Sequence, residues 1–145
     1  MNMSKFSAFM KQNKVERKNE QYAPTKSLIG GDGTPLRFEF RHLTSKENEK
    51  IRDDCTIDVQ VTGKPNVYRQ KLITNKYLNE MIVASTVVPD LYDAELQNSY
   101  GVKTPEDLIY AMIDDPGEYN DLSAWIQKFN GFDVSMDDKK EEAKN

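Results

Sequence analysis

The chain has 145 residues and a formal net charge of −4 at pH 7, with 37% hydrophobic and 30% charged residues. This length fits one domain, and the large charged fraction predicts a small core with solvated ends. The acidic balance argues against a nucleic-acid partner, because binding to a phosphate backbone depends on clustered lysine and arginine side chains.

The cysteine content and the hydropathy pattern also limit the possibilities. Cys55 is the single cysteine, so no intramolecular disulfide can form and a reducing compartment is expected. Residues 1–10 lack an apolar run of signal-peptide length, and no segment has the length and apolar character of a transmembrane helix. We therefore expect a soluble, cytoplasmic protein that does not contact a membrane.

The first 20 residues are predicted to form a short helical arm followed by a polar linker. Ser4 is a good capping residue, and Phe6, Phe9 and Met10 would share one face of the helix that it begins. So short a helix is not stable alone. Its apolar face either packs on the body of the same chain, which is the commoner arrangement, or is presented to another subunit or partner.

Two strands are predicted before residue 43. Residues 21–29 are predicted to form an edge strand, because Pro24 has no N–H to donate within a sheet. A glycine-rich turn at residues 30–35 leads into a strand over residues 36–42, in which apolar and polar side chains alternate. This alternation places three residues on one buried face: Leu36, Phe38 and Phe40.

A helix and a second hairpin are predicted next. Thr44 and Glu47 form a capping-box pattern that begins a largely exposed helix over residues 44–55. Its inward-facing pair is Ile51 and Cys55. Residues 56–61 and 67–73 contain β-branched residues on either side of a turn sequence, and this pattern predicts a hairpin.

The second half of the chain is predicted to be helical. A helix over residues 74–88 has the widest apolar stripe, and Pro89 marks its end. Shorter helices are predicted over residues 93–100, from Thr104 and from Asp115, and Gly101 is expected in a left-handed conformation. The predicted inward-facing residues are Tyr77, Leu78, Met81, Ile82, Ser85, Val88, Leu96, Tyr100, Leu108, Ile109, Met112, Ile113, Tyr119, Leu122, Ile126 and Phe129.

Together these elements predict an α+β fold, in which a small N-terminal β-hairpin or antiparallel sheet portion precedes a mostly helical C-terminal half. Three segments are expected along the chain. They are an arm and linker over residues 1–20, a single α+β domain over residues 21–131 (β-rich over 21–73 and helical over 74–131), and a charged tail over residues 132–145. The composition of the tail predicts disorder.

The helical half carries an acidic surface rather than a cluster of catalytic residue types. Nine carboxylates lie between residues 90 and 121, against one cation, Lys103. An apolar helical core with an acidic surface indicates a surface that binds another protein. The candidate contact residues are Leu91, Tyr92, Leu96 and Tyr100 in one patch, and Phe6, Phe9 and Met10 in the arm. For both groups the alternative is burial in the chain's own core.

Catalytic and metal-binding functions are disfavoured. His42 and Cys55 cannot be placed together from sequence, and both are interpreted as structural. A hydrolase would need acidic pairs such as Asp53–Asp54 or Asp114–Asp115, but adjacent acids on a helix point to different sides, and helix capping already explains these positions. No cofactor or metal ligand set is expected.

Several short motifs occur in a fixed order along residues 5–131. The most specific are Pro89-Asp90-Leu91, Glu95-Leu96-Gln97-Asn98-Ser99-Tyr100-Gly101-Val102 and Gly117-Glu118-Tyr119. Further motifs are the arm sequence from Phe6 to Asn13, Pro24-Thr25-Lys26-Ser27, and Arg41-His42-Leu43-Thr44. In this order the motifs resemble the XkdN-like tail assembly chaperones of contractile-tailed phages and prophages.

The resemblance implies a non-enzymatic protein that binds the phage tape measure protein and keeps it soluble while the tail tube assembles. Such a protein acts in the bacterial host cytoplasm and is absent from the mature virion. The resemblance brings no catalytic residues with it, and self-association remains open. The alternative function is a structural tail or baseplate component that stays in the virion.

Overall fold

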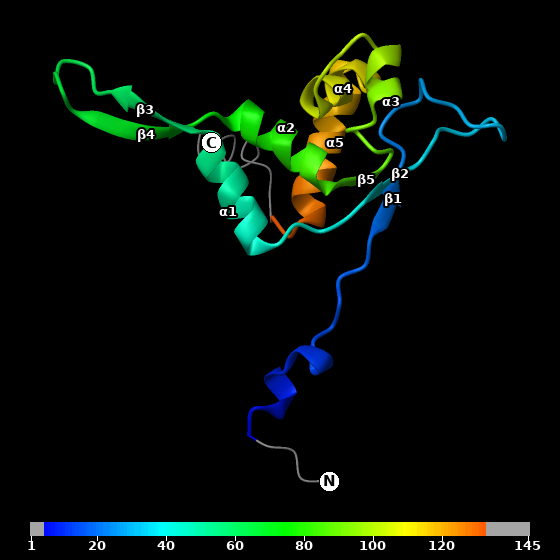
Figure 1. Cartoon of the computed structure of the whole chain (residues 1–145), viewed down its shortest axis with the longest axis horizontal. Helices are drawn as coiled ribbons and strands as arrows, with labels where there is room; N and C mark the ends of the chain where they lie inside the picture. The colour runs from blue at the N-terminus through cyan, green and yellow to red at the C-terminus, as the bar shows by residue number, and fades with distance from the viewer. Residues whose placement is uncertain (1–4, 133–145) are drawn as a thin grey trace, which may run out of the picture.

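The computed structural model describes residues 5–132 (Figure 1). The predicted tail over residues 132–145, apart from Phe132, and the predicted capping residue Ser4 lie outside the described part. Two 3-10 turns, Ser7–Phe9 and Lys11–Asn13, come first. The strands are β1 (Glu20–Tyr22), β2 (Phe38–Phe40), β3 (Thr56–Gln60), β4 (Tyr68–Leu72) and β5 (Thr86–Val88). The helices are α1 (Ser45–Asp54), α2 (Thr74–Ser85), α3 (Ala94–Ser99), α4 (Pro105–Met112) and α5 (Pro116–Phe129). Antiparallel strands early in the chain, followed by a mostly helical second half, confirm the α+β class.

A three-stranded antiparallel sheet has the order β1-β2-β5. Its third strand was missed, because residues 74–88 were predicted to be one continuous helix. The helix ends at Ser85, and Thr86–Val88 pair with β2, with Thr86 opposite Phe40. Three consecutive β-branched residues favour an extended backbone, and a free strand edge on β2 supplies the hydrogen-bonding partner.

The first predicted hairpin is shorter than expected. The edge strand predicted over residues 21–29 is limited to Glu20–Tyr22, and the chain leaves the sheet just before Pro24. Phe38 and Phe40 are buried as predicted, but Leu36 is 45% exposed. Leu36 precedes β2 and lies in the loop, where its N–H bonds to the Leu28 carbonyl at 2.7 Å, so the sheet does not cover its side chain.

The core lies between β2 and the helices α2, α4 and α5. Trp125 of α5 connects these layers: its ring stacks on Tyr22 of β1 with centroids 4.7 Å apart, and it also packs on Phe40 at 5.3 Å. The buried hydrophobic residues are Phe38, Phe40, Leu43, Cys55, Tyr77, Met81, Ile82, Val83, Leu91, Leu108, Ile109, Met112, Ile113, Leu122 and Ile126. The predicted inner faces of α4 and α5 are therefore largely confirmed.

Side-chain caps fix where the helices begin. Thr44 and Glu47 bond reciprocally in the predicted capping box. The Thr104 hydroxyl accepts from the Asp107 N–H, and the Asp115 carboxylate accepts from the Glu118 N–H, each pair at the start of its predicted helix. Gly101 has a φ of 70°, the left-handed conformation predicted at the end of α3.

The predicted second hairpin is present as an antiparallel pair, β3 and β4, with Thr56 opposite Leu72 and Gln60 opposite Tyr68. We call this pair the ribbon. The ribbon extends away from the helices at one end of the molecule, while α3 and β5 lie toward the other end (Figure 1). Most of its residues are exposed or half-buried, so it is not a layer of the core.

Candidate partner-binding surfaces

The N-terminal arm, residues 5–13, is not covered by the rest of the described chain. It forms two 3-10 turns instead of the predicted helix, held by bonds such as the Phe9 N–H to the Phe6 carbonyl at 3.0 Å. Phe6 is 66% exposed, Phe9 85% and Met10 46%. The expectation that this apolar face packs on its own body is therefore wrong. Figure 1 shows the arm extending from the body beyond the end of β1.

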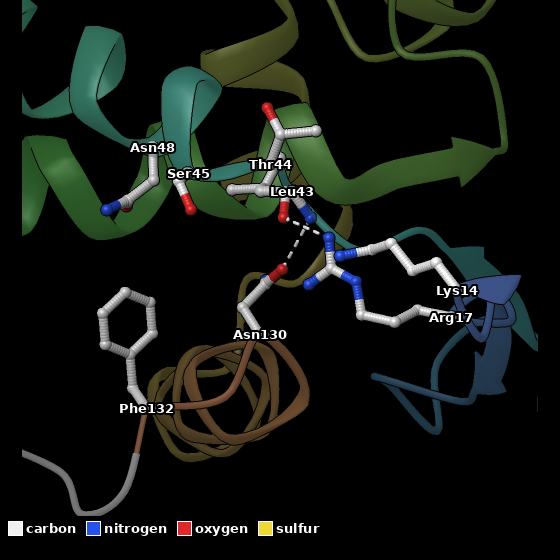
Figure 2. Close-up of a pocket in the computed structure, with 8 residues that line it drawn as sticks. All are labelled: Lys14, Arg17, Leu43, Thr44, Ser45, Asn48, Asn130 and Phe132. Carbon is white, nitrogen blue, oxygen red and sulfur yellow. Dashed lines mark hydrogen bonds between the residues drawn. The ribbon is translucent and has the colours of Figure 1, made fainter. Parts of the chain in front are cut away.

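The linker after the arm is attached to the body at Leu43. The Arg17 guanidinium donates to the Leu43 carbonyl at 2.8 Å, and the Leu43 N–H donates to the Asn130 side-chain oxygen at 2.8 Å. Figure 2 shows both bonds meeting at Leu43. Asn130 also donates to the Ser85 hydroxyl at 3.2 Å, so one residue after α5 connects α2 with the segment that follows β2.

An open cavity of about 710 Å³ lies beside this attachment (Figure 2). Its lining residues are Lys14, Arg17, Leu43, Thr44, Ser45, Asn48, Asn130 and Phe132. The charged lining groups are the two basic side chains of the linker. The Thr44 hydroxyl is already engaged with the Glu47 N–H, so this side chain is committed to the helix cap. The cavity contains no paired acid and base.

The second predicted patch divides into buried and accessible members. Leu91 is 2% exposed and belongs to the core, so its side chain is not available at the surface of the described chain. Leu96 and Tyr100 are half-buried and pack against the core, whereas Tyr92 is 72% exposed. We call Tyr92, Leu96 and Tyr100 the α3 patch. Val88, at the end of β5, is 51% exposed.

Three acidic residues of the helical half, Asp90, Asp93 and Glu118, stabilise local structure. The Asp90 carboxylate accepts from the Tyr92 N–H at 3.0 Å, and the Asp93 carboxylate accepts from the Leu96 N–H at 2.8 Å. Glu118 accepts from the Thr25 hydroxyl at 2.7 Å and from the Lys26 N–H at 2.8 Å. These bonds hold the three carboxylates in place at the surface.

One member of each acidic pair considered for hydrolysis has a structural partner. Asp54 forms an ion pair with Lys50 at 3.0 Å, and Asp115 caps α5. Across residues 5–132, no group of three or more histidine, cysteine, aspartate and glutamate side chains is arranged to hold a metal ion. Over the same residues, no helix has both the length and the apolar character needed to cross a bilayer.

His42 and Cys55 lie in different surroundings. The His42 ring stacks on Phe129 of α5 with centroids 3.8 Å apart. Cys55 ends α1, is 1% exposed, and has a thiol whose pKa is raised by burial. A raised thiol pKa reduces the thiolate fraction, which is opposite to the activation that a cysteine nucleophile needs. Both residues therefore pack as structural parts of the fold.

One exposed surface was missed by the sequence analysis. Residues 57, 59 and 61 point to one face of the ribbon and are aliphatic, yet the segment was identified only as a hairpin. The alternation of polar and aliphatic residues over positions 56–61 could have revealed this face. Side chains alternate along a strand, so the aliphatic residues share one face whether that face is buried or exposed. The sequence does not show which face of the ribbon is turned toward the rest of the molecule.

Comparison with known proteins establishes the family. The sequence model of the family described as "Phage XkdN-like tail assembly chaperone protein, TAC" matches residues 6–144. The chain therefore belongs to this family of phage tail assembly chaperones, as the motifs indicated.

Two relatives from Bacillus subtilis (strain 168) match over nearly their whole length. The phage-like element PBSX protein XkdN is 24% identical, covering 99% of this chain and 96% of that protein. The protein YqbN is 25% identical, covering 96% of this chain and 92% of that protein. The crystal structure of YqbN has a TM-score of 0.73 at 19% identity, covering 91% of this chain and 100% of that chain, and so shows the same fold.

Proposed function

We propose that this chain binds the tape measure protein of a contractile-tailed phage or prophage and keeps it soluble while the tail tube assembles, without catalysing a reaction. The exposed arm is the observation that supports this most directly. Phe6 and Phe9 are 66% and 85% exposed, although each ring buried against a partner would remove a large apolar area from water. An apolar segment that its own fold leaves uncovered is what a chaperone needs to hold a client.

The arm and the α3 patch have complementary properties as client-binding surfaces. Lys5, Lys11 and Lys14 are close in sequence to the apolar residues of the arm, and Lys5 lies over the Phe6 ring at 5.9 Å. Asp90, Asp93 and Glu95 are close in sequence to Tyr92 and Leu96 of the α3 patch. A long client with amphipathic segments of both charges would find an apolar contact with a matching charged rim at each surface. Leu91, which was also a predicted contact residue, is buried in the core and is not part of the proposed surface.

We further propose that the chaperone acts in the bacterial host cytoplasm as one α+β unit over residues 21–131, with residues 1–20 as its arm and linker, and that it is left out of the finished particle. A structural tail or baseplate component would instead remain in the virion. Mass spectrometry of purified particles separates these functions: a stoichiometric amount of this chain in the particle would contradict the chaperone proposal.

Co-expression with the tape measure protein tests the proposal. We expect the wild-type chain to keep the tape measure protein in the soluble fraction and to co-purify with it. The variant with Phe6→Ser and Phe9→Ser should lose most of this binding and keep its thermal unfolding midpoint, because both side chains are exposed. The matched control is Val15→Ser, which removes an 87% exposed apolar side chain from the linker.

A second variant examines the α3 patch. Tyr92→Asp places a charge on an exposed position that makes no core contact, so binding should weaken without loss of stability. Leu96→Asp and Tyr100→Asp are less informative, because both residues also pack against the core. A tape measure protein that is equally soluble when expressed alone would refute the proposed function.

A further inference from the structure

The ribbon has one aliphatic face and one mostly polar face, which also carries Tyr68 and Leu72. We call the second the polar face, and it is turned toward the body. The strand register puts Ile57 opposite Lys71 and Val59 opposite Arg69, and the Val61 N–H bonds to the Val67 carbonyl at 2.8 Å. Side chains alternate along each strand, so these residues share one face. We call it the aliphatic face of the ribbon: Ile57, Val59, Val61, Val67, Arg69 and Lys71.

The opposite face is the one that contacts α1. The Thr56 hydroxyl donates to the Arg52 carbonyl of α1 at 2.7 Å, and Asp58 and Gln70 line a small polar cavity together with residues of α1. In a hairpin that served only its own fold, the aliphatic face would be buried and the polar face solvated. Here Ile57 is 48% exposed and Val67 45%, while Val59 and Val61 are half-buried.

The four aliphatic residues have no partner in the core. Among residues 5–132, the partly buried hydrophobic residues that pack on the core include Leu72 of β4 but none of Ile57, Val59, Val61 and Val67. An isolated two-stranded ribbon is only marginally stable in water, so covering this face would stabilise it. A contiguous aliphatic surface at the end of an extended element is typical of an interaction site.

The charges on this face identify the chemistry of the occupant. Arg69 and Lys71 are exposed and lie among the aliphatic residues, while the one carboxylate in the two strands, Asp58, lies on the opposite face. Two copies of the face packed together would bring four cations close to an apolar contact, which is unfavourable. An amphipathic segment with carboxylates beside its apolar residues would neutralise both cations.

The size of the face fits one helix. Neighbouring strands lie about 4.8 Å apart, so a two-stranded face with its side chains is about as wide as an α-helix, roughly 10 Å. We propose that the aliphatic face of the ribbon binds an acidic amphipathic helix of the tape measure protein. This inference rests on the proposed function and adds a third contact surface, at the end of the molecule away from the α3 patch (Figure 1).

Charge reversal on the ribbon tests this inference. The protein is co-expressed with the tape measure protein and affinity is measured on the purified complex. Arg69→Glu with Lys71→Glu should weaken binding at least about tenfold, and the affinity of the wild-type protein should fall with added salt. Ile57→Ser with Val67→Ser should weaken it without changing the charge. The matched control is Gln60→Glu, which adds an acid to the polar face of the ribbon at a position opposite Tyr68 and should bind like wild type.

The outcomes separate this inference from the proposed function. A wild-type chain that fails to bind the tape measure protein contradicts the proposed function itself. Wild-type binding that both double variants retain in full overturns only the ribbon surface. Light scattering on the chain alone examines the other occupant. Oligomers that dissociate on Ile57→Ser with Val67→Ser would show that a second copy covers this face, and would also overturn the inference.

Discussion

Arg41 and Glu47 form a two-bond ion pair that joins the end of β2 to the first turn of α1. The Arg41 Nη1 donates to Glu47 Oε1 at 3.0 Å, and Nη2 donates to Oε2 at 2.6 Å. The same carboxylate accepts from the Thr44 N–H in the capping box. These bonds lower the pKa of Glu47 from its ordinary value of 4.5 to about 2, with the bond from Arg41 as the largest cause.

This ion pair predicts an acid-dependent loss of stability. Because the folded pKa of Glu47 is below its ordinary value, the unfolded chain binds the proton first as pH falls. The stabilisation is complete above pH 4.5 and is lost as pH falls toward 2. Both side chains are more than a third exposed, so we expect Glu47→Gln to cost only about 1–2 kcal/mol near neutral pH.

Urea unfolding between about pH 6 and pH 3 measures this effect. The stability difference between wild type and Glu47→Gln should shrink as the pH falls. Glu49→Gln, at an exposed position of the same helix, is the control for the change in net charge. A Glu47→Gln difference that stays constant with pH would show that the ion pair does not lower the pKa.

Substitutions at the adjacent residues Leu91 and Tyr92 are predicted to have very different effects on the stability of the fold. Leu91 is 2% exposed and Tyr92 is 72% exposed. Leu91→Ala should destabilise the fold by about 2–5 kcal/mol because it leaves a cavity in the core, whereas Tyr92→Ala should change stability by less than about 0.5 kcal/mol. Denaturant unfolding measures both. Equal costs at the two positions would contradict the burial of Leu91.

Tyr119 is predicted to stabilise the contact between α2 and α5 through its hydroxyl group. The buried Asn79 side chain donates to this hydroxyl at 3.0 Å, and burial raises the pKa of Tyr119. Tyr119→Phe keeps the ring but leaves the Asn79 amide without its acceptor, which should cost about 1–3 kcal/mol. Thermal unfolding of this variant is compared with that of Tyr92→Phe, an exposed control expected to be neutral.

Cys55 is predicted to react slowly with thiol reagents in the folded protein. The residue is 1% exposed, and burial raises the pKa of its thiol. Modification by a disulfide reagent at mildly alkaline pH should be more than about tenfold slower in the native protein than in denaturant. A native rate equal to the denatured rate would indicate an accessible thiolate and would reopen a catalytic function for this residue.

Much of the helical half was predictable because its information is local. Capping residues such as Thr104 and Asp115, the left-handed Gly101 and the apolar spacing of α4 and α5 act within a few residues along the chain. The family was also visible in short motifs, above all around Leu96 to Val102. These features depend on neighbouring residues, so they can be predicted without knowledge of the tertiary structure.

The failures involve partners that are distant in sequence. Thr86–Val88 continue the helical pattern of the residues before them. In the structure these β-branched residues pair instead with the free edge of β2, which lies more than 40 residues earlier in the chain. Leu91 and Tyr92 are both apolar neighbours, and only the packing of the helices decides that the first is buried and the second exposed.

The sequence by itself determined the helix starts, the main apolar stripes, the α+β class and the family. Capping and hydrophobic periodicity depend on residues that are close together in the chain. Tertiary structure alone decided which apolar side chains remain in contact with water. Phe6, Phe9 and Met10 of the arm, Tyr92, and Ile57 and Val67 of the ribbon stay exposed because the rest of the described chain does not cover them. A one-dimensional pattern cannot show which face has a neighbour.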